Sequence, residues 1–135
     1  MKIISLILIV IVFLTGCSKK EPAYIPSPDS QRFLGKYYLE ETCNFFDNDS
    51  VFNNSSWVEI RLGVKSDLLI DKVEIKDIKA FVSVDSLFFQ HWWKNYDGTT
   101  ASIRGKGIIK VDSLFLFYTA SGTFGEINCE CKGEK

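Results

Sequence analysis

Val111-Asp112-Ser113-Leu114-Phe115-Leu116-Phe117 decides the fold class of this chain, because it repeats the earlier string Val84-Asp85-Ser86-Leu87-Phe88-Phe89 almost residue for residue. In both copies an Asp-Ser pair separates two apolar runs rich in residues that favour strands. Asp and Ser are turn residues, so each copy predicts a hairpin with one strand before the turn and one after it. Two such hairpins in succession predict a meander.

Alternation of apolar and polar residues extends this pattern in both directions from the repeat. The alternating segments are 33–42, 57–64, 69–78, 80–84, 86–92, 101–111, 114–119 and 127–132. A period of two buries one face of a strand and exposes the other, as in antiparallel sheets. We therefore predict an all-β fold, an antiparallel meander of about seven or eight strands that forms a small up-and-down barrel or a rolled sheet. A short helical turn at 29–33 is the only helix that we expect.

Two local features modify this expectation. Gly105 and Gly107 flank Lys106 within a long strand, where a bulge or a sharp bend would help the sheet to curl. The stretch from Phe45 to Ser56 is dense in Asn and Ser, which predicts a mobile surface loop between the first two strands.

The N-terminal region is not part of this sheet. Lys2 and the apolar run Ile3 to Phe13 are typical of a secretory signal and too short for a membrane span, which needs about 20 apolar residues. All three prolines fall between residues 18 and 30, a composition that favours an extended tether. We therefore predict a signal peptide at 1–16, an N-terminal tether at 17–30 and a β-domain at 31–135.

The four residues Leu14-Thr15-Gly16-Cys17 resemble the lipobox of bacterial lipoproteins. The resemblance implies cleavage before Cys17, acylation of Cys17 and anchoring in a membrane of the cell envelope. Ser18 does not resemble the Asp that retains lipoproteins in the inner membrane, so we expect the outer membrane. Residues 18–21 are not an acidic run of the kind associated with surface export, so we expect the periplasmic face.

A second resemblance concerns the β-domain. Phe33-Leu34-Gly35-Lys36-Tyr37, then Cys43, Gly105-Lys106-Gly107, Leu114 to Tyr118 and Asn128-Cys129 follow one another as in small lipoproteins with a lipocalin-like or calycin-like meander. This resemblance covers most of residues 33–135. It implies a fold much more than an activity.

The cysteines predict one disulfide. Cys43 follows the first strand and Cys129 lies in the last, and these strands become neighbours when a meander closes. Cys131 lies on the same strand face as Cys129, so either could pair with Cys43 and leave the other as a free thiol. The lipocalin-like resemblance favours Cys129. The single residue between Cys129 and Cys131 is not the usual spacing of zinc ligands, so we expect neither a metal nor a cofactor.

Composition and motifs exclude several function classes. The chain has 16 Lys and Arg against 17 Asp and Glu, which is not the footprint of a nucleic-acid binder. His91 is the only histidine, and its strand context favours a packed ring over a general base. The chain contains no nucleophile elbow and no phosphate-binding glycine loop. We therefore expect no catalytic residues and no enzymatic activity.

Two classes of function remain after these exclusions. The first is a protein-interaction module of the envelope, such as an assembly subunit or an inhibitor. The second is a module for a small ligand or a glycan that uses an aromatic rim formed by Trp92, Trp93 and Tyr96. A barrel interior filled by large aromatic side chains favours the first class.

Three Asp-Ser pairs followed by an aliphatic residue resemble an O-glycosylation motif of some anaerobic Gram-negative bacteria. The hydroxyls concerned are those of Ser50, Ser86 and Ser113. Ordinary turn chemistry is the alternative explanation for Ser86 and Ser113.

Overall fold

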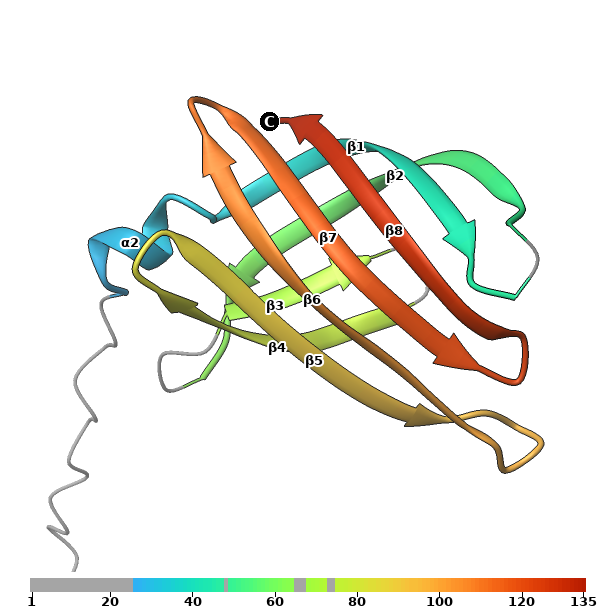
Figure 1. Ribbon diagram of the computed structural model, residues 1–135. Helices are drawn as coiled ribbons and strands as arrows, with labels where there is room; N and C mark the ends of the chain where they lie inside the picture. Colours follow the sequence, from blue (N-terminus) through green and yellow to red (C-terminus); the bar gives the residue numbers. More distant parts are fainter. Residues whose placement is uncertain (1–25, 48, 65–67, 73–74) are drawn as a thin grey trace, which may run out of the picture.

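The described part of the chain forms a closed barrel of eight antiparallel strands with one short helix before it (Figure 1). The computed structural model describes residues 26–47, 49–64, 68–72 and 75–135. The elements are α2 (Pro28–Gln31), β1 (Gly35–Phe45), β2 (Val51–Leu62), β3 (Leu68–Lys72), β4 (Ile75–Ser83), β5 (Ser86–Lys94), β6 (Thr100–Lys110), β7 (Ser113–Gly122) and β8 (Gly125–Glu134). Each strand pairs with the next, and β8 pairs with β1. The predicted all-β, up-and-down meander is therefore confirmed. The predicted signal peptide and Cys17 lie outside the described residues.

Alternate residues of each strand fill the interior of the barrel. In β7, Leu114, Leu116 and Tyr118 are buried, whereas Phe117 on the opposite face is exposed. The largest side chains with almost no exposed surface are Tyr37, Phe33, Leu39, Ile60, Leu68, Ile78, Leu87, Leu114, Leu116 and Val58. The core is thus built from every strand and from the segment after the helix.

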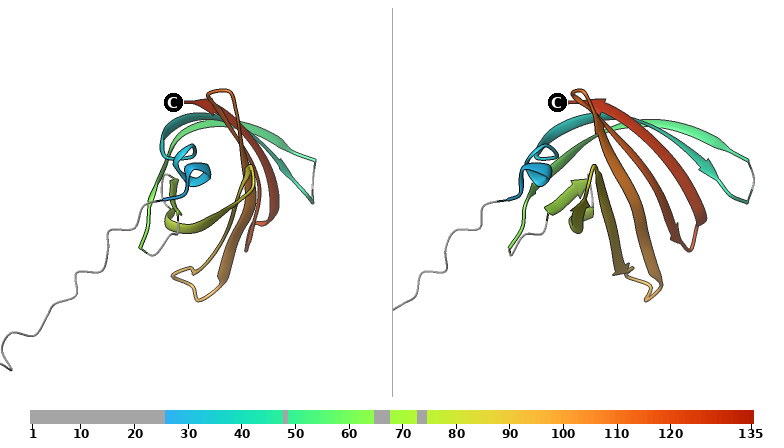
Figure 2. Two further views of the ribbon diagram at one scale, coloured as in Figure 1. Left: turned by 90° about the vertical axis from the view of Figure 1, so that its left-hand side faces the viewer. Right: turned by 60° about the vertical axis from the view of Figure 1, so that its left-hand side comes forward.

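The helix lies at one end of the barrel, within its mouth (Figure 2). Ser27 caps α2 by accepting a hydrogen bond from the Ser30 amide at 3.2 Å, and Pro28 occupies the first turn. Phe33 follows the helix and is completely buried, and its carbonyl accepts a hydrogen bond from the Tyr37 hydroxyl at 2.9 Å. Burial raises the pKa of Tyr37 to about 12. We call this the helix end of the barrel. The far end carries the turns that join β1 to β2, β5 to β6 and β7 to β8.

Two equivalent tight turns, Val84–Asp85 and Val111–Asp112, join β4 to β5 and β6 to β7 at the helix end. Both valines adopt a φ of 56°. A positive φ is sterically unfavourable for a β-branched residue, and turns of this length normally place Gly, Asn or Asp there. Each turn therefore has a strained backbone at its valine, and the side chain of that valine points into solvent.

Relieving this strain should stabilise the protein. Replacing Val84 and Val111 with Asn is expected to raise the free energy of unfolding by about 1 kcal/mol per turn, because Asn tolerates a positive φ and the valines are exposed. Urea unfolding of the single and double variants measures the gain, and the two gains should add because the turns are separate. Val82→Asn is a control from the same hairpin, and it should destabilise because Val82 packs against the core. A loss of stability in both turn variants would contradict the assignment of strain.

The predicted loop from Phe45 to Ser56 is wrong, because β2 begins at Val51 and only residues 46–50 connect the two strands. Polar side chains in this hairpin hydrogen-bond across the strands. The Thr42 hydroxyl donates to the Asn53 side-chain carbonyl at 3.0 Å, and the Tyr38 hydroxyl donates to the Ser55 hydroxyl at 2.8 Å. Residues 51–55 are exposed, so this end of the hairpin needs no apolar face.

Three further expectations differ from the structure. The alternating stretch 69–78 is divided between β3 and β4, and Arg61 and the Asp77 amide both donate to Asp71 near this division, at 2.9 Å and 2.8 Å. The pairing of β6 with its neighbours runs through Gly105 and Gly107 without a shift, so no bulge is present there. The predicted helical turn at 29–33 is observed slightly earlier, at Pro28–Gln31.

Candidate functional site

A row of aromatic rings crosses the outer face of the barrel between β4 and β7. Phe81 pairs with Phe88 across β4 and β5, and their rings stack with centroids 5.5 Å apart. Lys106 of β6 pairs with Phe88 on one side and with Phe117 on the other. Phe81 and Phe117 are 61% and 43% exposed. An apolar row of this kind on the solvent face does not contribute to the core.

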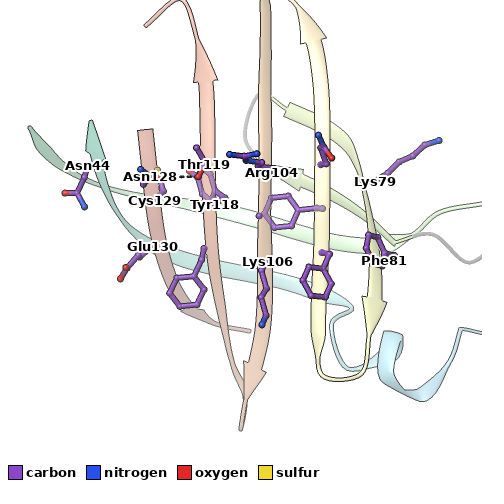
Figure 3. A pocket seen from close by; sticks show the side chains of 15 residues that line it. Asn44, Lys79, Phe81, Arg104, Lys106, Tyr118, Thr119, Asn128, Cys129 and Glu130 are labelled. Carbon is purple, nitrogen blue, oxygen red and sulfur yellow. Dashed lines mark hydrogen bonds between the residues drawn. The ribbon is translucent and has the colours of Figure 1, made fainter. Parts of the chain in front are cut away.

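A polar row lies beside the aromatic one, one step closer to the far end. It contains Gln90, Arg104, Thr119, Asn128 and Asn44, which face one another in register from β5 to β1. The Thr119 hydroxyl donates to the Asn128 side-chain carbonyl at 2.7 Å (Figure 3). The two rows line a groove of about 780 Å³, within the size range of ligand sites. We call it the outer groove.

Basic groups dominate the charge of the outer groove. Lys79, Arg104 and Lys106 line it together with a single acidic side chain, Glu130. The Lys106 ammonium lies 5.7 Å from the centroid of the Phe88 ring, which is a cation–π distance. The outer groove therefore offers stacking surface, planar hydrogen-bonding groups and positive charge together.

Gly105 forms part of the floor of the outer groove. A Cβ at this position would lie 2.5 Å from the Phe117 carbonyl oxygen and 2.6 Å from Cζ of Phe89. Both distances are shorter than real Cβ contacts, so β6 can pack this closely only with glycine here. The glycine that suggested a bend thus acts by allowing close approach of neighbouring strands.

The aromatic rim predicted from Trp92, Trp93 and Tyr96 is not a single surface. Trp93 faces inward, where its indole N–H donates to Asn95 at 3.2 Å and its ring stacks on His91 at 6.0 Å. Trp92 points to the outer face, and Tyr96 is fully exposed in the connection after β5. None of the three lines the outer groove.

A buried polar cluster lies inside the barrel, formed by Glu41, Lys72, Tyr118 and Cys131. The Glu41 carboxylate accepts hydrogen bonds from the Tyr118 hydroxyl, from the Lys72 ammonium at 3.2 Å and from the Cys131 thiol at 3.4 Å. The Glu41 side chain is 3% exposed and that of Lys72 is 16% exposed. The carboxylate is thus surrounded by donors of the same chain.

These contacts shift the ionisation of the cluster. Burial by itself would raise the pKa of the Glu41 carboxyl, but the hydrogen bonds from Tyr118 and Lys72 and the Lys72 charge outweigh it and lower that pKa. Burial, followed by the hydrogen bond to Glu41, raises the pKa of Tyr118. Burial and the nearby Glu41 charge raise the pKa of the Cys131 thiol. Around neutral pH, the carboxylate is therefore ionised while the phenol and the thiol stay protonated.

Cys43 and Cys129 are joined by a disulfide that links β1 to β8, and Cys131 is a buried free thiol. The pair is the one that the lipocalin-like resemblance favours. Glu41 lies close enough to both sulfurs to form a three-donor set for a metal, but the disulfide occupies them.

The three serines of the Asp-Ser motifs occupy different settings. Ser50 is exposed just before β2, whereas Ser86 and Ser113 are half-buried first residues of β5 and β7 beside the two strained turns. Their O-glycosylation stays a prediction.

Sequence reasoning did not find the outer groove. The available signal was the phase of the alternation, since Phe81, Phe88 and Phe117 fall on the side of their strands opposite to the buried residues.

Comparison with known proteins supports the fold. No protein-family model matches the chain, and no curated protein does. A crystal structure of a candidate outer membrane protein from Bacteroides fragilis NCTC 9343 is 12% identical, with a TM-score of 0.51, over 80% of this chain and 53% of that one. A protein of unknown function of the DUF3598 family from Nostoc punctiforme PCC 73102 is also 12% identical, with a TM-score of 0.48, over 87% of this chain and 53% of that one. This chain spans about half the length of each, and at 12% identity the likeness to the Bacteroides fragilis protein concerns the fold alone.

None of the helices among the described residues has the length and hydropathy of a membrane-spanning segment.

Proposed function

We propose that this chain is a lipid-anchored lipoprotein of the cell envelope whose lipocalin-like barrel binds a partner protein without catalysing a reaction. The lipobox-like residues 14–17 support the anchor and the envelope location, with the periplasmic face of the outer membrane as the expected place. The outer groove is the observation that carries the binding role.

The composition of the outer groove suits a protein interface. Aromatic residues and Arg are the types that supply most binding energy at such interfaces, and exposed apolar patches commonly mark them. Phe81, Phe117 and Arg104 are of these types and lie on strands, which hold them in fixed positions. The positive charge of the outer groove favours a partner with acidic residues around an apolar anchor.

The absence of catalysis is part of the proposal. Glu41, Tyr118 and Cys131 have shifted pKa values of the kind found in active sites, yet they bind one another in the filled interior. His91 packs against Trp93. Their contacts suit a structural role for these groups.

A photo-crosslinking experiment tests the binding role. Benzoylphenylalanine at position 117 of the lipidated chain, irradiated in its own envelope, is expected to capture one protein in stoichiometric amount. The same amino acid at Lys36, an exposed position on β1 outside the outer groove, is the control and should capture none of it. With the partner isolated, Phe81→Ala and Phe117→Ala should each weaken binding about tenfold.

Phe117 lies on the outer face, so its truncation should leave the melting temperature nearly unchanged. A loss of binding in this variant would therefore not be caused by unfolding. Equal capture from positions 117 and 36 would contradict an interface at the outer groove.

A glycan is the second candidate ligand, because Gln90, Arg104 and Asn128 present planar hydrogen-bonding groups beside the rings. Failure to capture any protein, together with retention of envelope glycans that Arg104→Ala abolishes, would favour this candidate.

A further inference from the structure

Four exposed aliphatic side chains surround the helix end of the barrel. Val84 and Val111 occupy the first positions of the two tight turns and are 78% and 94% exposed, and Leu62 and Val64 project from the end of β2. Aliphatic residues are unusual at turn tips, which ordinarily carry Gly, Asn, Asp or Ser. We call these four residues the apolar tips.

The backbone is strained at two of the apolar tips, and the side chains there do not stabilise the barrel by burial. Val84 and Val111 hold a positive φ that Asn or Gly would adopt more easily, and their exposed side chains bury almost nothing in the fold. Strain of this kind, repeated at two equivalent places, indicates a use for the side chain outside the folded domain.

The chain enters the barrel at this same end. Arg32, directly after α2, forms an ion pair with Asp85 of the first turn at 2.8 Å, and the Lys135 ammonium donates to the Arg32 carbonyl at 3.5 Å. A pocket beside the second turn is lined by Arg32, Val111 and Lys135 among others. The residue that follows α2 is thus held beside the turns that carry Val84 and Val111.

The length of the preceding segment limits how far this end can lie from a membrane. Pro26 follows Cys17 by nine positions, and nine extended residues span at most about 30 Å. A lipid on Cys17 therefore holds the start of the described chain within about 30 Å of the bilayer. At such a distance, weak apolar contacts are favoured by their high effective concentration.

We propose that the apolar tips insert into the surface of the lipid bilayer, so that the barrel stands on the membrane with its helix end down. This inference rests on the lipid anchor of the proposed function. In this orientation the outer groove lies on the side of the barrel, and the exposed rings of Phe46, Tyr96 and Phe124 at the far end face away from the bilayer.

Fluorescent probes on the reconstituted lipoprotein test this orientation. The lipidated variants Val84→Cys, Val111→Cys and Tyr96→Cys are labelled with an NBD maleimide and placed in vesicles of phosphatidylethanolamine and phosphatidylglycerol. The buried thiol of Cys131 should not react in the folded protein. We expect blue-shifted emission and protection from aqueous iodide at positions 84 and 111, and full quenching at position 96.

The outcomes separate the two proposals. Failure of the chain to float with vesicles removes the anchor and overturns both. Flotation with full iodide quenching at positions 84 and 111 overturns the docked orientation and leaves the anchor intact. Protection at position 96 in place of 84 and 111 also overturns it, because the far end would then face the bilayer.

A second variant guards against a local effect of the label. Val84→Asn together with Val111→Asn should fold at least as well as the wild type, because it relieves the two strained turns. An NBD probe at Val64→Cys should show a blue-shifted emission in the otherwise unchanged chain. In the double Asn background the same probe is expected to lose much of that blue shift, while flotation with vesicles is unchanged. An undiminished blue shift would show that the valine tips do not hold this end at the membrane.

Discussion

Replacing both Cys43 and Cys129 with Ala is expected to lower the free energy of unfolding by about 2–5 kcal/mol, the largest single effect that we foresee. The bond joins two cysteines that are 86 positions apart in the sequence, so it removes much conformational freedom from the unfolded chain. It also joins the first strand to the last, where the barrel closes. Urea unfolding of the oxidised wild type and the double variant measures the difference.

Cys131→Ala is the matched control for this prediction. Cys131 lies two residues from Cys129 on the same face of β8 and forms no disulfide, so its truncation should lower the free energy of unfolding by less. A reducing agent should lower the stability of the wild type to that of the double variant and leave the double variant unchanged. A Cys131→Ala effect as large as that of the pair would contradict the proposed source of stability.

Replacing Glu41 with Leu is the second large expected effect, a loss of about 3 kcal/mol in the free energy of unfolding. The Lys72 ammonium would lose its carboxylate partner, stay mostly buried and keep only the face of the Tyr118 ring beside it among the contacts described. The Tyr118 hydroxyl and the Cys131 thiol would lose their acceptor as well. The partial exposure of Lys72 should keep the loss at the lower end of the range for buried ion pairs.

A double-mutant cycle distinguishes the ion pair from simple loss of packing. Lys72→Met should destabilise the wild type, because it leaves the Glu41 carboxylate without a cation. In the Glu41→Leu background the same change should be neutral or stabilising, because it removes an unpaired charge. Additive losses in the cycle would mean that the two groups do not interact in solution.

The lowered pKa of Glu41 predicts how the cluster responds to acid. A carboxyl whose pKa is lower in the folded than in the unfolded state stabilises the fold above its unfolded value, which is about 4.3 for Glu. That contribution is lost as the pH falls towards the folded-state pKa. The stability gap between wild type and Glu41→Leu should therefore shrink between pH 6 and pH 3, as urea midpoints at the two values measure. A constant gap would contradict the ionised state of Glu41.

The sequence was sufficient for the architecture because the information for it is local. Period-two burial in 114–119 and 127–132 identifies strands and their inner faces, and the repeated Val-Asp-Ser strings locate two hairpins. The prediction of a loop at the Asn- and Ser-rich residues 51–55 was wrong, because their strand depends on hydrogen bonds from Thr42 and Tyr38 of β1. Composition within a short window contains no information about such partners.

The outer groove and the polar cluster were missed because both depend on neighbours far apart in the chain. Alternation shows that Phe81 and Phe117 face outward, but only the register of four strands brings them into one row. Glu41 and Lys72 each occupy an inward position of their strand. A charged residue at an inward position of the alternation was the signal in the sequence that could have indicated a buried polar cluster. Their pairing depends on the curvature of the closed sheet.

Closure between β1 and β8 also determines the order in which this protein can assemble. Seven of the eight strand pairs join consecutive strands and can form as soon as each hairpin exists, whereas the eighth needs both ends of the sheet. Cys43 and Cys129 come together only in that eighth pair. In the folded protein the two sulfurs are therefore neighbours only because the barrel is closed. Pairing of strands this far apart in the sequence slows folding, because the chain between them must be ordered before their contacts form.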